Sequence, residues 1–293
     1  MKRVGIFFFR ITSWIFSRIP LSVMYIIADF VYFLLFFVIG YRKKVVFKNL
    51  RNSFPEKTEE EIKKIATLFY HHLGDIFVEN IALIQMKPEK VKKMIDFESC
   101  ITASDIFNEN KHIVLVTAHY NNWEFYLVLP LLSPHKTLGV YKPLNNKYYD
   151  KEFFTMRTKF GVLPVSMNDS FRTILTFDKN KEYVSLGLIA DQRPPRSSSN
   201  YWTSFLNQDA SIFLGPEKIA KKIKAPIIFT HLEKIKRGKY KMVFDKVIED
   251  PSIFKEFEIT ETYVRWVEKL IQEKPEYYLW SHNRWKHKRN PQK

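Results

Sequence analysis

A histidine and a glutamate in the string His119-Tyr-Asn-Asn-Trp-Glu124 are the strongest candidates for chemistry in the sequence. Residues 113–117 form a short run rich in β-branched side chains, which predicts a buried strand that delivers His119 to its carboxyl end. Glu124 would then lie in the first turn of a helix, and across such a turn the two side chains can meet in a hydrogen bond. A carboxylate on one imidazole nitrogen raises the basicity of the other, so the pair can take a proton from an alcohol.

A second interpretation fits the same spacing: His119 caps the turn and Glu124 faces solvent. A bare His-x4-Glu pair does not separate the two. No G-x-S-x-G nucleophile elbow is present, which argues against a lipid hydrolase. Five further histidines lack the company typical of metal ligands, so we expect structural or surface roles for them and predict no metal and no cofactor; they are His71, His72, His112, His135 and His231. We expect His282 to be structural or to face headgroups.

The elements that must position these residues follow from periodicity. Thr58 with three glutamates after it predicts a capped helix start, and apolar residues at helical spacing extend that helix past Glu79. From about residue 111, β-rich runs alternate with helical periods, which predicts an α/β sheet. We expect strands at residues 113–117, 138–141 and 183–189, helices at 122–132, 151–160 and 260–272, an antiparallel hairpin of 226–232 with 239–247, and a long irregular loop at 193–211.

The first 44 residues differ in kind from the rest. Residues 21–40 are apolar or aromatic except for Ser22 and Asp29, and at ~1.5 Å per residue they can cross a hydrocarbon core of ~30 Å. Cations and aromatic residues alternate in residues 1–20, which predicts a second helix in the membrane interface. We therefore expect a membrane anchor at 1–44 and a catalytic domain at 45–293. A buried core helix is the alternative for 21–40, and Asp29 favours it.

Composition limits the partners. Lys and Arg number 47 against 31 Asp and Glu, and the net charge of +16 indicates a polyanionic partner or membrane face. The basic residues are scattered and form no recognised nucleic-acid module, so we expect no nucleic-acid partner. A hydrophobic fraction of 46% with 26 Phe excludes a disordered chain and suits a protein that meets lipid. A single cysteine, Cys100, indicates a reducing compartment without disulfides.

Several short motifs together resemble one known family. The string from His119 to Glu124 is similar to the H-x-G-N-W-E form of the His-x4-Asp/Glu block in bacterial lipid A late acyltransferases (lauroyl and myristoyl transferases), within the lysophospholipid acyltransferase-like superfamily. Further matches run in family order along nearly the whole chain: Asn49 to Pro55, Val140 to Pro143, Arg157 with Gly161, Asp191-Gln192, Phe205-Leu206, Gly215-Pro216, and Pro275 to Lys286. Asn121 and Asn207 stand where the family has glycine.

This resemblance implies an αβα acyltransferase domain with a mixed central sheet, behind an N-terminal membrane-anchoring helix. It implies transfer of a fatty acyl chain from acyl carrier protein to a hydroxyl of a lipid A precursor, at the cytoplasmic face of the bacterial inner membrane. His119 would be the general base, and Glu124 would orient its ring. Arg157 would bind acceptor phosphate or the developing oxyanion, the alternative being a structural ion pair.

Three further polar residues are candidate substrate-binding groups. Asp191 and Gln192, at the end of the strand expected at 183–189, would place the acceptor or order the loop of His119; a helix or loop cap is the alternative. Asn122 would supply a polar contact or cap the following helix, and we favour the cap. Two other functions stay open: acyl transfer to another membrane amphiphile, such as a glycolipid or aminolipid, and non-enzymatic lipid binding at the membrane.

Overall fold

The computed structural model describes residues 2–96, 111–131, 133 and 135–289, so Cys100 lies outside the described residues. Its core is a seven-stranded sheet in the order β1-β9-β8-β2-β5-β3-β4. The five strands from β8 to β4 run parallel, and β8 pairs with β9 in an antiparallel hairpin. The strands are β1 Ile95–Asp96, β2 Ile113–Thr117, β3 Lys136–Tyr141, β4 Leu163–Ser166, β5 Val184–Ile189, β8 Ile227–Lys236 and β9 Lys239–Ile248.

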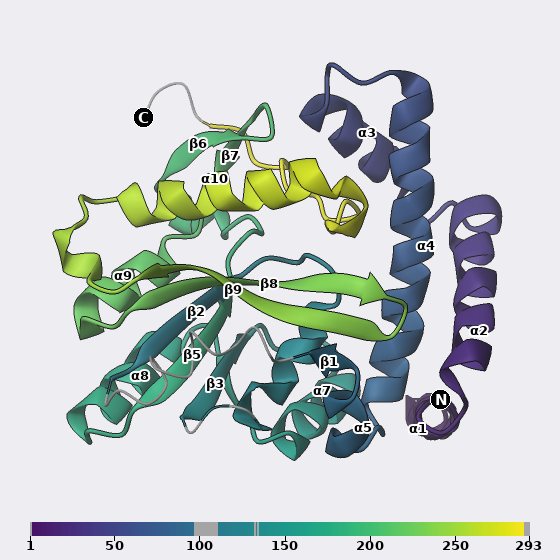
Figure 1. The fold of residues 1–293 in the computed structure, drawn as a ribbon, viewed down its shortest axis with the longest axis horizontal. Helices are drawn as coiled ribbons and strands as arrows, with labels where there is room; N and C mark the ends of the chain where they lie inside the picture. The colour runs from purple at the N-terminus through teal and green to yellow at the C-terminus, as the bar shows by residue number, and fades with distance from the viewer. Residues whose placement is uncertain (1, 97–110, 132, 134, 290–293) are drawn as a thin grey trace.

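Helices cover both faces of this sheet (Figure 1). One hydrophobic cluster joins α8, α9 and α10 to one face, and a second joins α5, η3 and α7 to the other. The mixed α/β fold expected from the sequence is therefore confirmed. These helices are α5 Pro88–Lys92, the 3-10 helix η3 Trp123–Leu131, α7 Lys147–Lys159, α8 Ser170–Lys179, α9 Gly215–Ile223 and α10 Glu258–Glu273.

The expected elements are mostly present, with two differences. Residues 122–132 were expected to be an α-helix, but Trp123–Leu131 forms a 3-10 helix that contains Pro130; proline lacks the N–H that an α-helical turn needs. The loop expected at 193–211 is not irregular throughout. It contains the short 3-10 helix η4 Arg196–Ser198 and an antiparallel hairpin of β6 Trp202–Phe205 with β7 Gln208–Ser211.

The long helix α4, Glu59–Leu83, stands beside the end of the sheet at which β8 terminates (Figure 1). Its start is the expected one: the Thr58 hydroxyl accepts from the backbone N–H of Glu61, and the Glu61 carboxylate accepts from the backbone N–H of Thr58. The amino-terminal half of α4 belongs to one hydrophobic cluster and its carboxyl-terminal half to the other. This helix therefore ties both layers of the domain together.

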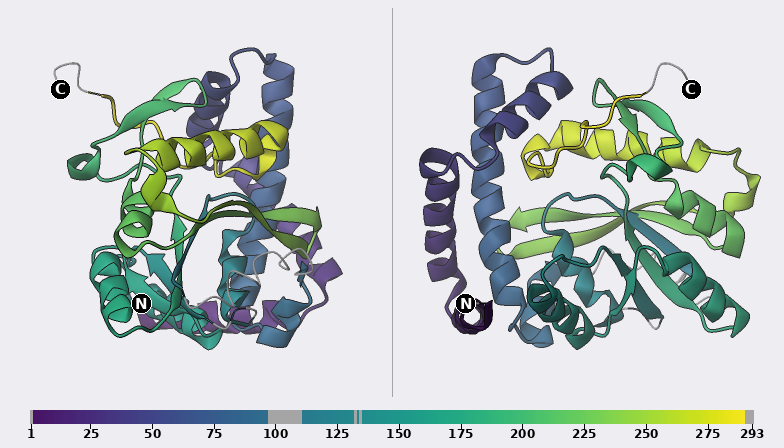
Figure 2. Two further views of the ribbon diagram at one scale, coloured as in Figure 1. Left: turned by 60° about the vertical axis from the view of Figure 1, so that its left-hand side comes forward. Right: turned by 180° about the vertical axis from the view of Figure 1, so that it is seen from behind.

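Two N-terminal helices pack at the outer edge of the molecule, namely α1 Lys2–Phe16 and α2 Leu21–Phe33 with its π-helical extension η1 Leu34–Val38 (Figures 1 and 2). The third, α3 Lys43–Ser53, lies on the other side of α4. Among the described residues, one segment, Leu21–Val38, is long and apolar enough to cross a membrane. Its helix α2 lies against α4. Gly74 permits this contact, because a Cβ at that position would lie 2.6 Å from the backbone oxygen of Ala28.

Replacing Gly74 with valine should therefore push α2 away from α4. Overpacking of this kind destabilises a protein by ~1–3 kcal/mol. Urea denaturation of the full chain in detergent measures the effect, and Lys64→Val, at an exposed position of the same helix, is the matched control. Valine is a better helix former than glycine, so helix propensity alone would not destabilise Gly74→Val. Equal stability of the two variants would contradict the close contact.

Candidate active site

His119 lies two residues beyond β2, where the parallel pairing of β2 with β5 brings Asp191 beside it. Thr117 pairs with Ile189 in this register, so the two chains leave the sheet side by side. The Asp191 carboxylate accepts from the backbone N–H of His119 at 2.9 Å, and the same oxygen lies 2.8 Å from His119 Nδ1. Because a carboxylate only accepts, Nδ1 carries a proton, and in a neutral imidazole the lone pair then lies on Nε2.

Asp191 is buried, so its negative charge needs local support. Burial alone opposes ionisation, but the hydrogen bonds from His119 and the nearby positive charge of Arg284 hold the pKa of Asp191 below its ordinary value. Arg284 is itself 2% exposed and donates to the backbone oxygen of Ser211 at 2.7 Å. The carboxylate that faces His119 is therefore ionised at neutral pH.

Glu124 does not take the place expected for it. Asp191 accepts from His119, whereas Oε1 of Glu124 lies 3.5 Å from Nη2 of Arg157, which α7 brings in from the next layer. Both side chains are largely buried, at 16% and 19% exposure. The structural ion pair considered for Arg157 is thus present, and the ordering role considered for Asp191 accounts for its contacts.

Gln192 and Asn122 contact opposite sides of this site. The side-chain nitrogen of Gln192 lies 3.1 Å from His119 Nε2, where it donates to the lone pair. Asn122 is fully buried and donates to Oε2 of Glu79 at 2.7 Å. The side chain of Asn122 therefore bonds to α4, and its substrate-binding role stays a prediction.

Two asparagines that stand where the family has glycine, one of them in the turn after His119, have left-handed backbone angles. Asn121 has φ of 55° and Asn207 has φ of 60°, both in the left-handed region that glycine adopts without strain and asparagine tolerates. Asn121 also donates its side-chain amide to the backbone oxygen of Leu232 at 2.6 Å. This bond ties the turn to β8.

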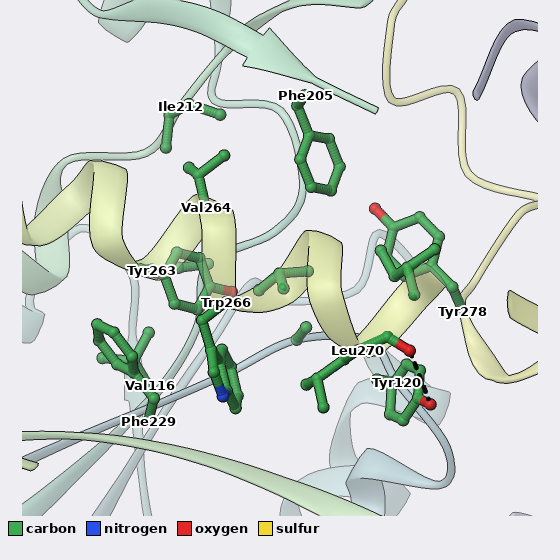
Figure 3. Close-up of a cluster of buried hydrophobic side chains, with 14 of the residues drawn as sticks. Val116, Tyr120, Phe205, Ile212, Phe229, Tyr263, Val264, Trp266, Leu270 and Tyr278 are labelled. Atoms are coloured by element: carbon green, nitrogen blue, oxygen red, sulfur yellow. Dashed lines mark hydrogen bonds between the residues drawn. The ribbon is translucent and has the colours of Figure 1, made fainter. Parts of the chain in front are cut away.

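The C-terminal segment packs against the turn that carries His119. The backbone N–H of Leu279 donates to the His119 oxygen at 3.2 Å, and that of Asn121 donates to the Tyr277 oxygen at 3.0 Å. Figure 3 shows Tyr120 beside α10, where its hydroxyl donates to the backbone oxygen of Leu270 at 3.2 Å. The turn that carries His119 is therefore fixed on three sides, by β8, α10 and the C-terminal segment.

Two joined cavities open at this site. The outer cavity, of about 420 Å³, is lined by His119, Glu124, Arg157 and Gln192. The inner cavity, of about 110 Å³, shares Glu124 and Arg157 with it and is otherwise mainly apolar. Its floor is a row of neighbours on three strands: Leu115 pairs with Gly187, and Gly187 pairs with Gly139. Because two of the three lack a side chain, space remains above the sheet.

Two residues near this site were not predicted to act there. His282 lines the outer cavity, and burial lowers its pKa to about 4, so its imidazole is neutral at pH 7. Glu79 is buried on α4 and accepts from Asn122, from Tyr25 of α2 at 2.5 Å and from Tyr240 of β9 at 2.9 Å. The sequence could have indicated Glu79, because it is an acidic residue within an otherwise apolar stripe of a helix.

Across residues 2–96, 111–131, 133 and 135–289, no group of three His, Cys, Asp or Glu side chains could hold a metal ion.

Comparison with known proteins identifies the class. The family model described as "Bacterial lipid A biosynthesis acyltransferase" matches residues 1–287. The chain is 24% identical over 247 residues to the lipid A biosynthesis palmitoleoyltransferase of Escherichia coli strain K12, which covers 84% of this chain and 79% of that protein. A lipid A biosynthesis acyltransferase of Shigella flexneri matches with the same values. The α/β fold and this family match together define the protein as an acyltransferase. The chain belongs to the bacterial lipid A biosynthesis acyltransferase family, and it acts in lipid A biosynthesis.

Glu79 predicts a specific dependence of stability on pH. Burial raises the pKa of Glu79 above its ordinary value, although the hydrogen bonds it accepts oppose this. A raised folded-state pKa contributes stability that is fully present below the unfolded value of ~4.3 and is lost as pH rises through the folded value. Glutamine does not ionise, so the free energy of unfolding of the wild type relative to Glu79→Gln should decline from pH 4 to pH 8.

Urea denaturation across this pH range measures that difference. Glu60→Gln, at an exposed position on the same helix, is the matched control and should give a much smaller slope. If the free energy of unfolding of the wild type relative to Glu79→Gln instead rose with pH, Glu79 would be ionised in the native state and stabilised by its three hydrogen-bond donors.

Proposed function

We propose that the chain transfers a fatty acyl group from acyl carrier protein to a hydroxyl of a lipid A precursor, with His119 as general base and Asp191 as its orienting carboxylate. The observation that carries this proposal is the 2.8 Å contact between His119 Nδ1 and Asp191 at the wall of a cavity. It leaves Nε2 of a neutral imidazole as the proton acceptor. A carboxylate behind the ring stabilises the imidazolium that forms.

The reaction needs no covalent enzyme intermediate. As the acceptor hydroxyl attacks the thioester carbonyl, Nε2 of His119 takes its proton and a C–O bond forms. The tetrahedral intermediate then collapses, the C–S bond breaks, and the imidazolium returns the proton to the leaving thiolate. The products are an ester and a free thiol, so protons and electron pairs balance.

Before the acceptor binds, Gln192 occupies the nitrogen of His119 that must accept the proton. Its amide nitrogen donates to the lone pair that must receive the proton. The acceptor hydroxyl must therefore displace this amide from Nε2. Once displaced, the amide is free to donate to the substrate, which agrees with the expectation that Gln192 contacts the acceptor.

Arg157 is the candidate for binding negative charge. A guanidinium has five N–H donors, and the contact with Glu124 at 3.5 Å engages one of them. Its position at the junction of the two cavities suits a group that faces the thioester oxyanion or an acceptor phosphate. Glu124 would hold the guanidinium in place rather than support the imidazole of His119.

The inner cavity is the candidate site for the acyl chain, because it is mainly apolar and adjoins the charged residues. The net charge of +16 supports an acidic carrier protein as the donor and a phosphorylated glycolipid as the acceptor. The match with an enzyme named palmitoleoyltransferase supports a fatty acyl donor. The anchor and the reducing environment expected for a chain with one cysteine support a cytoplasmic active site.

Replacement of the base should remove most turnover. Loss of a general base reduces a rate by ~10² to 10⁴, so His119→Ala should fall in this range. Asp191→Asn should be comparably severe, because an asparagine amide that donates to Nδ1 would force the proton onto Nε2. The double variant should be little worse than His119→Ala, because the two residues act as one unit.

These variants are assayed for acyl transfer from carrier-protein and coenzyme A thioesters to a lipid A precursor and to other hydroxylated lipids. Asp209→Asn, an exposed acidic residue on β7, is the matched control and should keep full activity. A well-folded His119→Ala protein with more than about a tenth of wild-type turnover would exclude this mechanism. Transfer only to another amphiphile would retain the mechanism and change the acceptor.

Gly187 tests the assignment of the inner cavity. A Cβ at Gly187 would meet only the backbone oxygen of Leu138, at an ordinary 3.6 Å, so the fold should accept valine there. The added side chain would fill space above the sheet, and Gly187→Val should shift the preferred donor toward shorter acyl chains. Competition between thioesters of different length measures this shift. A uniform loss of rate at all lengths would contradict the assignment.

A further inference from the structure

The helix that could cross a membrane is packed against the soluble domain along one face. Met24, Tyr25 and Ala28 of α2 are at most 6% exposed, and they face α4 across the close contact at Gly74. The hydroxyl of Tyr25 donates to Glu79, a residue that also accepts from the turn of the candidate active site. This face of α2 is therefore part of the domain core.

A polar cluster occupies the middle of the same segment. Asp29, the ninth residue of Leu21–Val38, forms an ion pair with Arg237 from the β8–β9 hairpin, and Arg237 also contacts Asp75 of α4 at 3.1 Å. The side chains of Asp29 and Arg237 are 47% and 35% exposed. If α2 crossed a bilayer, these charges would lie near its midplane, where ionised groups are strongly disfavoured. Its partner helix α4 would have to enter the bilayer as well.

The opposite face of α2 is apolar and free. Five side chains at helical spacing are 42% to 69% exposed, namely Val23, Ile26, Phe30, Phe33 and Phe37. They lie on the side of the helix turned away from α4. A continuous exposed stripe of this kind is unusual on a soluble surface and is typical of a helix that lies in a membrane interface.

Helix α1 also exposes apolar side chains. Phe7, Ile11 and Trp14 recur on one side and are 61%, 40% and 51% exposed. Its other side packs on α4, where the Ser13 hydroxyl donates to the backbone oxygen of Ile81 at 2.7 Å, and Arg10 donates to Glu152 of α7 at 2.6 Å. Because α7 also carries Arg157, α1 joins the apolar surface to the helix that lines the candidate active site.

Cations flank the surface at both ends of α2. The Arg18 guanidinium lies 4.0 Å above the Trp14 ring, and the Lys43 ammonium lies 3.9 Å from the Phe36 ring. Arg42 and Lys44 adjoin Lys43 in the chain. Aromatic rings paired with cations match the boundary between acyl chains and anionic headgroups.

We propose that α1 and α2 lie parallel to the membrane within one leaflet, so that Leu21–Val38 enters the bilayer without crossing it. The free faces of both helices bury in the acyl-chain region, and the cations at their ends contact anionic headgroups. Asp29 and Arg237 then sit at the level of the interface. Both ends of α2 are on the same side of the membrane as the catalytic domain. This inference concerns attachment and does not depend on the proposed catalytic residues.

Cysteine labelling of the full chain tests this topology. In a Cys100→Ser background, Arg18→Cys and Lys44→Cys place single thiols at exposed positions on either side of α2. A membrane-impermeant maleimide is applied to intact spheroplasts and to inverted vesicles, and detergent-solubilised samples give the total reactive thiol. Both thiols should react in the same preparation. Reaction of Arg18→Cys in one preparation and of Lys44→Cys in the other would overturn the proposal.

Vesicle binding tests the face that meets lipid. Phe30→Glu places a charge on the free stripe, and Ile253→Glu, at a position 76% exposed on the short 3-10 helix η5 Pro251–Ile253, is the matched control. Flotation with vesicles of phosphatidylcholine and phosphatidylglycerol at about 3:1 measures partition. Phe30→Glu should bind at least about tenfold more weakly than wild type, and Ile253→Glu should bind as wild type. Unchanged binding of Phe30→Glu, or a stable dimer that buries the stripe, would contradict the assignment of this face to lipid.

Discussion

The parallel pairing of β2 with β5 is the constraint on which the candidate active site depends. His119 and Asp191 each follow a paired strand end by two residues, so the register of Thr117 with Ile189 sets the distance between imidazole and carboxylate. A shift by one residue would turn one of these side chains to the other face. The fully buried pattern of β2 and the cover of helices on both faces hold this register.

Burial of charge is the second organising feature. Asp191 and Glu79 are both enclosed, yet their surroundings differ. Asp191 has the imidazole of His119 and the positive charge of Arg284 nearby, and the pKa of its carboxyl falls. Glu79 has neutral donors close to it, and burial raises its pKa. The pKa values of two buried carboxyls behind one turn are therefore shifted in opposite directions, lowered for the partner of a base and raised for a packing group of the core.

Helix α2 and the turn that carries His119 share this packing group. Tyr25 of α2 and Asn122 of the turn both donate to Glu79, so the apolar N-terminal helix contacts the candidate site through one side chain. A chain that acylates a lipid must hold its cavity beside the membrane. In this structure α2 contacts the turn through α4, and α1 contacts the cavity wall through α7.

The sequence by itself determined the helix start at Thr58, the strand before His119, the hairpin of β8 and β9, and the apolar N-terminal segment, because each rests on local spacing or capping. It also singled out the polar residues of the site through their family motifs. It did not determine which carboxylate meets His119. Glu124 is near in sequence, but Asp191 is near in space, because strand order brings distant residues together. The π-helical turn and the burial of one face of α2 were likewise decided by tertiary packing, which overrides local preference wherever apolar surface is enclosed.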